Sequence, residues 1–388
     1  MWFFKSPQII FGTDALSHLD QIQGKRAFIV TDRVIQSLGF VDSVRDRLSQ
    51  AGIDSQVFMD VQPDPSLATV RACAAAMQEY SPDWIVGLGG GSCLDAAKAA
   101  WFVYERPDVD LQAINPVEHF GLRTKARLIT IPTTAGSGAE VSQAAVISDL
   151  EARRKLELAT YELVADLTIV DPQFSAQMPP QLTADSGIDV LSHALEGYNN
   201  QWSNDFTDGL CLHATRLVFK YLPRAVQAGA LDAEAREKMA NAATMAGMVI
   251  CNSNIALAHA LGHSAGAILK LPHGRVTALF LPRVIEYAAN KGFGRYMDIA
   301  CLLNLPAEDE LQASRSVSAA ICELMEAVGL PVSLRAAGIP PEAFEAELEA
   351  LCDGAEMDLG YVMSLRIPDR YELEQLFKCA YDGLAVNL

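Results

Sequence analysis

The sequence has few of the features that mark secreted, membrane or nucleic-acid-binding proteins. Its eight cysteines include no CxxC pair, and no run reaches the roughly 18 uncharged apolar residues that a membrane span needs. The start lacks the basic segment and long apolar stretch of a secretion signal. Basic residues are scarce, 30 Lys and Arg against 48 Asp and Glu, a net charge of -18. We therefore expect no nucleic-acid partner and no membrane partner.

The scattered cysteines, several of them in apolar runs, predict free thiols in a reducing compartment, so we expect a cytoplasmic protein. Half of the residues are hydrophobic and a fifth are charged, as in ordinary globular enzymes. A chain of 388 residues is long enough for two domains, each with its own core.

The two halves of the chain carry different patterns. In the first half, short β-branched runs alternate with helical segments over 37–51 and 66–79, which predicts βαβ units and a mostly parallel sheet. The expected strands are 27–31, 56–61, 84–88, 128–131 and 167–170. Beyond Pro172 the pattern becomes helical, over 183–198, 207–221, 233–251, 255–267 and 311–328. We predict a Rossmann-like α/β dinucleotide-binding domain over 1–177 and an all-α domain over 178–388.

A glycine run follows the expected strand at 84–88. Gly89, Gly90, Gly91 and Ser92 precede a helix that carries Asp95 near its start. Backbone N–H groups at such a helix start, with no side chains in the way, suit a pyrophosphate. The spacing is not GxGxxG, and a tight turn in which Ser92 and Asp95 cap the helix is the alternative. Three consecutive glycines exceed what a turn requires and favour the phosphate site.

Two further segments are candidates for cofactor binding. Asp32 closes the first strand, where a carboxylate can accept hydrogen bonds from ribose hydroxyls and repel a 2′-phosphate, although a solvated strand end is the alternative. Thr133, Thr134 and Ser137 lie among glycines after another strand, and their hydroxyls suit phosphate and ribose oxygens. An ordinary polar turn explains the second segment equally well.

The histidines point to a metal. Only seven occur, and four fall in two short stretches of the helical half. Asp189 and His193 are four residues apart, as are His259 and His263, and His273 follows Pro272. Helical spacing places each pair on one face of an otherwise uncharged helix, where burial is costly unless a cation compensates. Carboxylate with imidazole suits Fe(II) or Zn(II), and the sequence does not separate the two ions.

Together these motifs resemble the group III, iron-containing alcohol dehydrogenases over essentially the whole chain. GGGSCLDAAK, PTTAGSGAEV, the DxxxH pair and the spaced histidines carry the resemblance, in the family's order. The resemblance implies an NAD-dependent enzyme that interconverts a small alcohol or diol and its aldehyde. It also implies an N-terminal α/β domain, a helical C-terminal domain, a cleft between them, and a homo-oligomer, often a dimer.

Carried over residue by residue, the resemblance implies a function for each candidate. The metal ligands fall on Asp189, His193, His259 and His273, with Fe(II) as the expected ion. His263 matches a histidine lining the nicotinamide and substrate cleft, where it either relays a proton or has only a structural role. The cofactor loops match at Gly89–Ser92 and at Thr133, Thr134 and Ser137, Lys155 matches a lysine near the nicotinamide ribose, and Asp32 stands where relatives that prefer NAD carry Asp.

The sequence departs from the family pattern in two places. SGIDV at 186–190 replaces a common TGxDA and leaves the ligands intact, whereas Ser364, Leu365 and Arg366 replace a frequent NPR that borders the cleft, which puts the substrate in doubt. Two other functions stay open. One is a relative with other chemistry, such as a glycerol dehydrogenase or dehydroquinate synthase; the other is a non-catalytic NAD-binding sensor with a structural metal.

Overall fold

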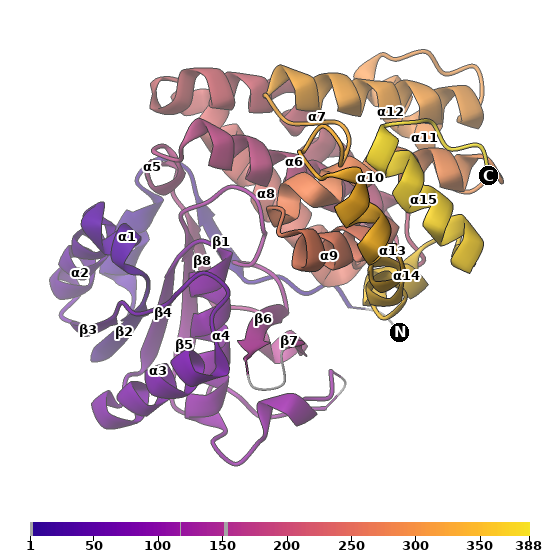
Figure 1. The fold of residues 1–388 in the computed structure, drawn as a ribbon. Coiled ribbons are helices and arrows are strands. Elements are labelled where there is room, and N and C mark those ends of the chain that lie inside the picture. The colour runs from indigo at the N-terminus through magenta and orange to yellow at the C-terminus, as the bar shows by residue number, and fades with distance from the viewer. Residues whose placement is uncertain (1–2, 117, 151–153) are drawn as a thin grey trace. The chain divides into compact units, whose positions relative to one another are not determined.

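The computed structural model describes residues 3–116, 118–150 and 154–388. The chain divides into two compact units, Met1–Gln177 and Met178–Leu388. Figure 1 draws the first in indigo to magenta and the second in magenta to yellow. The units meet in sequence just before the Pro179–Pro180 pair, whose second proline opens a long helix.

The first unit is built on a six-stranded parallel sheet, as the alternating pattern predicts. Its order is β1-β8-β5-β4-β2-β3. The strands in that order are Gln8–Phe11, Leu167–Val170, Arg127–Pro132, Trp84–Gly89, Arg26–Val30 and Asp54–Phe58. The chain leaves β2 in one direction to form β3 and returns to the other side of β2 to form β4. The carboxyl ends of β2 and β4 therefore flank a topological switch point, the usual place for a bound nucleotide in such sheets.

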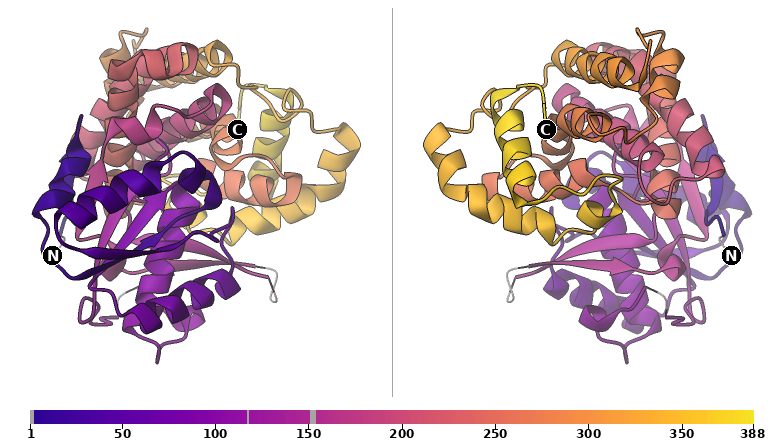
Figure 2. Two further views of the ribbon diagram at one scale, coloured as in Figure 1. Left: turned by 90° about the vertical axis from the view of Figure 1, so that its left-hand side faces the viewer. Right: turned by 90° about the vertical axis from the view of Figure 1, so that its right-hand side faces the viewer.

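Both faces of this sheet are covered (Figure 2). Alternate residues of each strand point to opposite faces. Phe28, Ile85 and Leu128 pack with α3 (Leu67–Tyr80) and α4 (Gly91–Glu105) in one apolar core. Ile29, Val86 and Ile129 pack on the other side with η1 (Ala15–Gln21), α1 (Arg33–Ser37) and α2 (Phe40–Gln50). The continuous apolar runs that read as strands are thus buried on two sides.

The structure corrects several predicted boundaries. The helix expected over 37–51 is two helices, because Gly39 between them adopts a left-handed φ of 78°. The strand expected over 56–61 is shorter and ends at Phe58. The prediction also missed the edge strand β1 and the antiparallel hairpin of β6 (Ala144–Asp149) and β7 (Arg154–Ala159). β1 is short and incompletely buried, and β6 begins with alanines, so neither shows a clear strand pattern.

The second unit is helical throughout its described length, apart from an isolated bridge between Asn200 and Ser364. After the four-residue helix α5 (Pro172–Ser175), its helices are α6 (Pro180–Tyr198), α7 (Asp205–Ala228), α8 (Ala233–Asn252), α9 (Leu257–Leu269), α10 (His273–Ala289), α11 (Tyr296–Leu303), α12 (Glu310–Ala327), α13 (Pro341–Glu356), α14 (Leu359–Met363) and α15 (Arg370–Asp382). Helix α6 is buried along most of its length and packs against α7, α8, α9 and α10.

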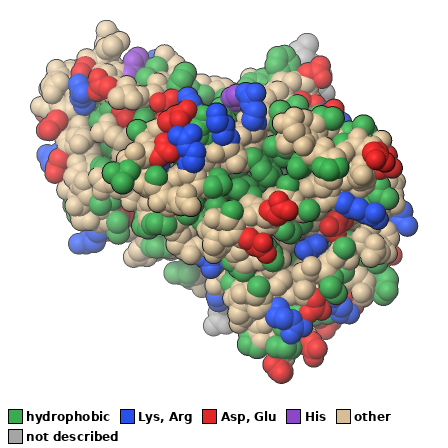
Figure 3. Space-filling view, turned by 90° about the horizontal axis from the view of Figure 1, so that it is seen from above, with side chains coloured by type: hydrophobic (Ala, Val, Ile, Leu, Met, Phe, Trp, Pro, Cys, Tyr) green, Lys and Arg blue, Asp and Glu red, His purple; other side chains and the backbone are tan. Residues whose placement is uncertain are grey.

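In the part of the chain that is described, no single helix has the length and apolar content to cross a membrane. Only α8 and α9 taken together reach that threshold, and they are bent by 104° at the break between them. On the face shown in Figure 3, acidic side chains are spread among basic and apolar ones.

Candidate metal centre and cofactor loops

The metal candidates on α6 share one buried face. Asp189 and His193 are one helical turn apart, and their side chains are each 5% exposed. Helix α10 begins directly beside them, because Gly274 has no side chain. A Cβ there would lie 2.2 Å from the Asp185 carbonyl oxygen and 2.8 Å from the Asp189 Cβ. This close approach brings the preceding residue, His273, to the carboxylate of Asp189.

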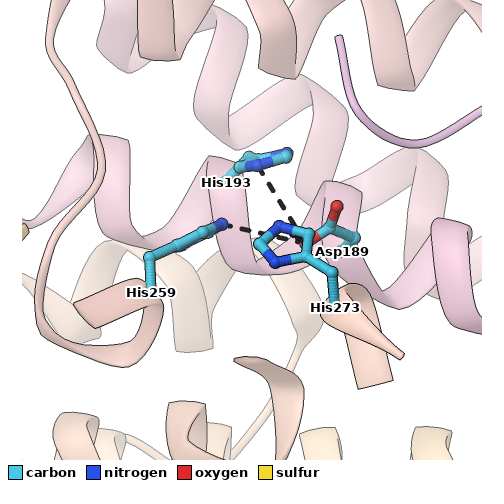
Figure 4. A group of neighbouring side chains, drawn as sticks. All are labelled: Asp189, His193, His259 and His273. Atoms are coloured by element: carbon cyan, nitrogen blue, oxygen red, sulfur yellow. Dashed lines mark ion pairs between the residues drawn. The ribbon is translucent and has the colours of Figure 1, made fainter. Parts of the chain in front are cut away.

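Four side chains from three helices converge at this point (Figure 4). The Oδ1 atom of Asp189 lies 4.0 Å from Nε2 of His193, 3.8 Å from Nε2 of His259 and 3.7 Å from Nε2 of His273. One ligand atom from each of the four residues lies within 4.8 Å of the others. The structure thus gathers the four residues that the family resemblance implies as ligands.

The donor set fits a divalent cation. Oδ1 of Asp189, Nε2 of His259 and Nδ1 of His193 are buried without a hydrogen-bond partner among the described residues. Buried polar atoms without a partner are rare, and the usual reasons include an ion that the coordinates do not contain. A cation among these atoms would satisfy the Asp189 oxygen and the His259 nitrogen at once.

The electrostatics of the group hold its members in the protonation states that metal binding requires. Burial opposes the charge on Asp189, but the surrounding imidazoles, His193 foremost, lower the pKa of this carboxyl below its usual value. Burial, followed by the neighbouring His193, lowers the pKa of His259 well below that of a free imidazole. An ionised carboxylate beside neutral imidazoles is the form that coordinates a metal.

A second carboxylate, Glu196, lies behind the metal group and was missed from the sequence. It is 3% exposed, and its Oε2 atom lies 2.5 Å from Nδ1 of His259. Burial raises the pKa of Glu196 to about 7, opposed by hydrogen bonds from the backbone N–H groups of Ala256, Ala258 and His259. A signal was present: Glu196 follows Asp189 and His193 on α6 at spacings of seven and three, which places it on the same helix face.

His263 lies beside the metal group. Its ring stacks on that of His273 at 5.1 Å between centroids and meets the ring of His259 at 5.7 Å. Nδ1 of His263 is 2.7 Å from Oδ2 of Asp358, a residue that caps α14 by accepting a hydrogen bond from the N–H of Gly360. The sequence offered no signal for Asp358, because 95 residues separate it from His263.

The cofactor candidates gather in the first unit, at the carboxyl ends of three neighbouring strands. Gly89 ends β4 and pairs in register with Pro132 of β5, so the two loops that follow start side by side. A Cβ on Gly90 would lie 3.3 Å from Cγ2 of Thr134, and a Cβ on Gly91 would lie 3.3 Å from Oγ of Ser137. Thr133 donates its backbone N–H to Gly89. The glycines are therefore needed for the two loops to meet.

Helix α4 does not have the side-chain cap that was the alternative explanation of this run. Its N-cap residue is Gly90, with no side-chain hydrogen bond. Ser92 instead accepts a hydrogen bond from the backbone of Asp64, and the carboxylate of Asp95 accepts one from the N–H of Val146. The first turn of α4 is thus left without a side-chain cap, as an anion site requires.

Asp32 and Lys155 flank this loop. Asp32 is the N-cap of α1, where it accepts a hydrogen bond from the N–H of Ile35, and its other oxygen accepts one from the thiol of Cys93. It is therefore a helix cap and not merely the solvated strand end considered from the sequence. The Nζ atom of Lys155 forms an ion pair with Asp64 at 2.6 Å, which places it beside Ser92.

The segment that departs from the family pattern lines a small internal cavity of the second unit. Ser364, Leu365 and Arg366 border this cavity together with Glu196. Arg366 is engaged by Tyr287 and Glu372. All eight cysteines are free thiols, as predicted.

The chain matches the sequence models of two domains. "Iron-containing alcohol dehydrogenase" matches residues 6–172, and "Fe-containing alcohol dehydrogenase family, C-terminal" matches residues 183–381. It is 33% identical to an NADPH-dependent butanol dehydrogenase of Clostridium saccharobutylicum over 100% of both chains. It is 36% identical to aldehyde-alcohol dehydrogenase 2 of Entamoeba histolytica over 99% of this chain and 47% of that protein. The chain thus spans about half the length of several curated relatives.

The fold is also similar to solved structures. A sulfoacetaldehyde reductase from Bifidobacterium kashiwanohense, solved in complex with NAD+, superimposes with a TM-score of 0.87 and 26% sequence identity. The alignment covers 97% of this chain and 98% of that one. The agreement therefore extends over both units.

Proposed function

The chain belongs to the iron-containing alcohol dehydrogenase family, and we propose that it interconverts a small primary alcohol or diol and its aldehyde by hydride transfer with NAD(H). The observation that carries this proposal is the approach of three imidazoles to one buried carboxylate oxygen, that of Asp189. We assign Asp189, His193, His259 and His273 as the metal ligands. The butanol dehydrogenase among the relatives supports the substrate class.

A bound divalent cation would supply Lewis-acid chemistry, polarising the alcohol oxygen so that its proton is lost near neutral pH. The four ligands would hold that cation and orient it. They also keep three imidazoles uncharged, since burial lowers the pKa of His259 and the ionised Asp189 is their common neighbour. The role of the metal is thus proposed as catalytic, with Fe(II) as the ion.

In the first unit, we assign the cofactor to the loops at the switch point. The uncapped N-terminus of α4, at Gly90, Gly91 and Ser92, would bind the pyrophosphate. The hydroxyls of Thr133, Thr134 and Ser137 would bind phosphate or ribose oxygens, with Lys155 nearby. Asp32 would accept hydrogen bonds from the adenosine ribose, which favours NAD over NADP. The NAD+ complex of the sulfoacetaldehyde reductase supports this assignment.

His263 is the group that we propose to move the proton. Asp358 accepts a hydrogen bond at Nδ1 of the ring, which leaves Nε2 as the nitrogen that takes up a proton. The side chain of His263 is 39% exposed, so the proton has a route onward to water. Asp358 thus fixes the orientation and tautomer of the imidazole.

The test is an absorbance assay of NADH oxidation with a panel of short aldehydes, including propanal, after anaerobic loading with Fe(II). We expect turnover with at least one of them and oxidation of the matching alcohol with NAD. Turnover of glycerol alone would instead favour a glycerol dehydrogenase. Binding of NADH and metal without turnover of any pair would favour a non-catalytic sensor.

We also propose a cytoplasmic location and a homo-oligomer, a dimer or larger. The eight free thiols support a reducing compartment. Sedimentation of the purified chain at micromolar concentration tests the oligomeric state, with a single species of monomer mass as the contrary result.

A further inference from the structure

Helix α6 contributes a third functional side chain beyond the two ligands. Glu196 lies on the ligand-bearing face of α6, and its carboxylate reaches across to α9. It is buried, and no Lys or Arg of the described chain forms an ion pair with it. A buried carboxylate without a basic partner is costly to maintain, so its hydrogen bonds are the place to seek its role.

Every hydrogen bond to this carboxylate has the protein as donor. The backbone N–H of Ala258 donates to Oε1, and those of Ala256 and His259 donate to Oε2 at 3.1 and 3.3 Å. These donors require an acceptor, which is what an ionised carboxylate provides. The fourth contact, Nδ1 of His259 at 2.5 Å from Oε2, must then also be a donor.

The tautomer of His259 follows from this geometry. With its proton on Nδ1, a neutral imidazole carries a lone pair on Nε2. Nε2 is the atom that lies 3.8 Å from Oδ1 of Asp189, is buried, and has no hydrogen-bond partner among the described residues. The ring is therefore turned and protonated as a metal ligand needs.

We propose that Glu196 is a positioning residue for the metal: through Nδ1 of His259 it fixes the ring orientation and the tautomer that presents Nε2 to the cation. This inference rests on the proposed function, which supplies the cation. The partner of a metal-bound imidazole raises its basicity and typically changes metal affinity by about 10- to 100-fold. Helix α6 would thus supply two ligands and the group that orients a third.

A purely structural role is the competing explanation, since Glu196 also accepts three N–H groups at the start of α9. The two roles separate in a double-mutant cycle. Glu196→Gln keeps the shape of the side chain but exchanges one acceptor oxygen for an NH2 group. Acting through the ring, it should weaken metal binding only while His259 is present. Acting on α9 alone, it should weaken binding equally in a His259→Ala background.

The experiment measures the Zn(II) dissociation constant of the full chain by competition with a chromophoric chelator. We expect Glu196→Gln to weaken binding about 10- to 100-fold in the wild-type background and less than about twofold with His259→Ala. Glu310→Gln is the matched control, because Glu310 likewise accepts two backbone N–H groups, those of Tyr296 and Met297, but contacts no ligand. It should leave the dissociation constant unchanged. Equal losses in both backgrounds would overturn the proposal.

A second measurement needs no variant of Glu196. In the metal-free wild-type chain, with 15N-labelled histidine, long-range proton–nitrogen NMR should show His259 protonated at Nδ1 and not at Nε2. The opposite tautomer would overturn the proposal even if Glu196→Gln does not fold. The proposed function fails separately, if wild-type chain binds metal with Glu196 acting as described but turns over no alcohol or aldehyde.

Discussion

Nδ1 of His263 lies 2.7 Å from the Oδ2 atom of Asp358, whose other oxygen caps α14. The carboxylate thus connects the imidazole beside the metal group to a helix start that comes 95 residues later in the chain. Burial opposes the charge of Asp358, but the hydrogen bond from His263 helps to lower the pKa of this carboxyl below its usual value. The pair therefore consists of an ionised acceptor and a ring that donates from Nδ1.

Replacing this carboxylate should slow turnover without removing the metal. Asp358→Asn keeps the helix cap, because Asn caps as well as Asp, but removes the charge that orients His263. We expect kcat to fall about tenfold or more, since a positioned acid–base group typically contributes about 10²- to 10⁴-fold. Metal content by elemental analysis should stay the same. An unchanged kcat would give His263 a structural role only.

Removing a proposed ligand should affect metal and activity together. His259→Ala takes one imidazole from a group whose atoms have few other partners, so the cation would lose a donor. Bound metal and turnover should decrease in parallel. His213→Ala is the matched control, because His213 is an exposed histidine of α7 that bonds only to Arg216 in the described chain. Full metal content in His259→Ala would show that this residue is not a ligand.

Sequence patterns predicted the parts of this protein that depend on local repetition. The strand at Leu167–Val170 and the helix of Asp189 and His193 follow directly from buried apolar runs and helical spacing. The convergence of His259 and His273 on Asp189 depends instead on helix packing, which Gly274 permits by its missing side chain. Family resemblance implied that convergence; periodicity did not.

The features that were missed are those that join distant segments. Asp358 contacts His263 through the fold alone, and its own neighbourhood resembles an ordinary polar loop. Asp32 caps a helix that the sequence pattern placed later, because the break at Gly39 hid the start of α1. Glu196 was the exception, since its helical spacing was visible and only its partner was not.

The capping role of Asp32 sharpens the test of cofactor preference. Asp32→Gly removes the ribose acceptor and the charge that opposes a 2′-phosphate, so the ratio of kcat/KM for NADP to that for NAD should rise. It also removes the cap of α1, although Gly in place of a capping residue costs only a few tenths of a kcal/mol. Asp32→Asn keeps the cap and removes the charge alone. It should raise the ratio too, and an unchanged ratio in both variants would leave Asp32 only its capping role.

Binding of NAD should weaken as the pH rises past 6. Burial raises the pKa of Asp95 to about 6, with Lys98 acting in the opposite direction. This carboxyl lies in the early part of α4, near the proposed pyrophosphate site. Below pH 6 it is protonated and neutral, whereas above that pH its charge repels the phosphates. The dissociation constant of NAD, measured by calorimetry between pH 5.5 and 7.5, should therefore increase with pH.

The variant Asp95→Asn is the control for this pH dependence. It keeps an oxygen for the N–H of Val146 and cannot ionise. Its NAD affinity should match that of the protonated wild type at low pH and stay level as the pH rises. If the wild type and the variant showed the same slope, another group would be responsible and Asp95 would lie too far from the phosphates to matter.

The identity of the metal can be separated from the identity of its ligands. Zn(II) generally binds nitrogen and oxygen donors more tightly than Fe(II), so a group of one carboxylate and three imidazoles does not exclude it by affinity. Activity need not follow affinity. If Fe(II) is the working ion, enzyme purified in air should lose activity as the iron oxidises or dissociates. Chelator-stripped protein, reloaded anaerobically with each ion in turn, should then oxidise NADH with propanal faster with Fe(II) than with Zn(II). Equal or faster turnover with Zn(II) would refute iron while leaving Asp189 and its three histidines as the ligands, because both ions would have bound there.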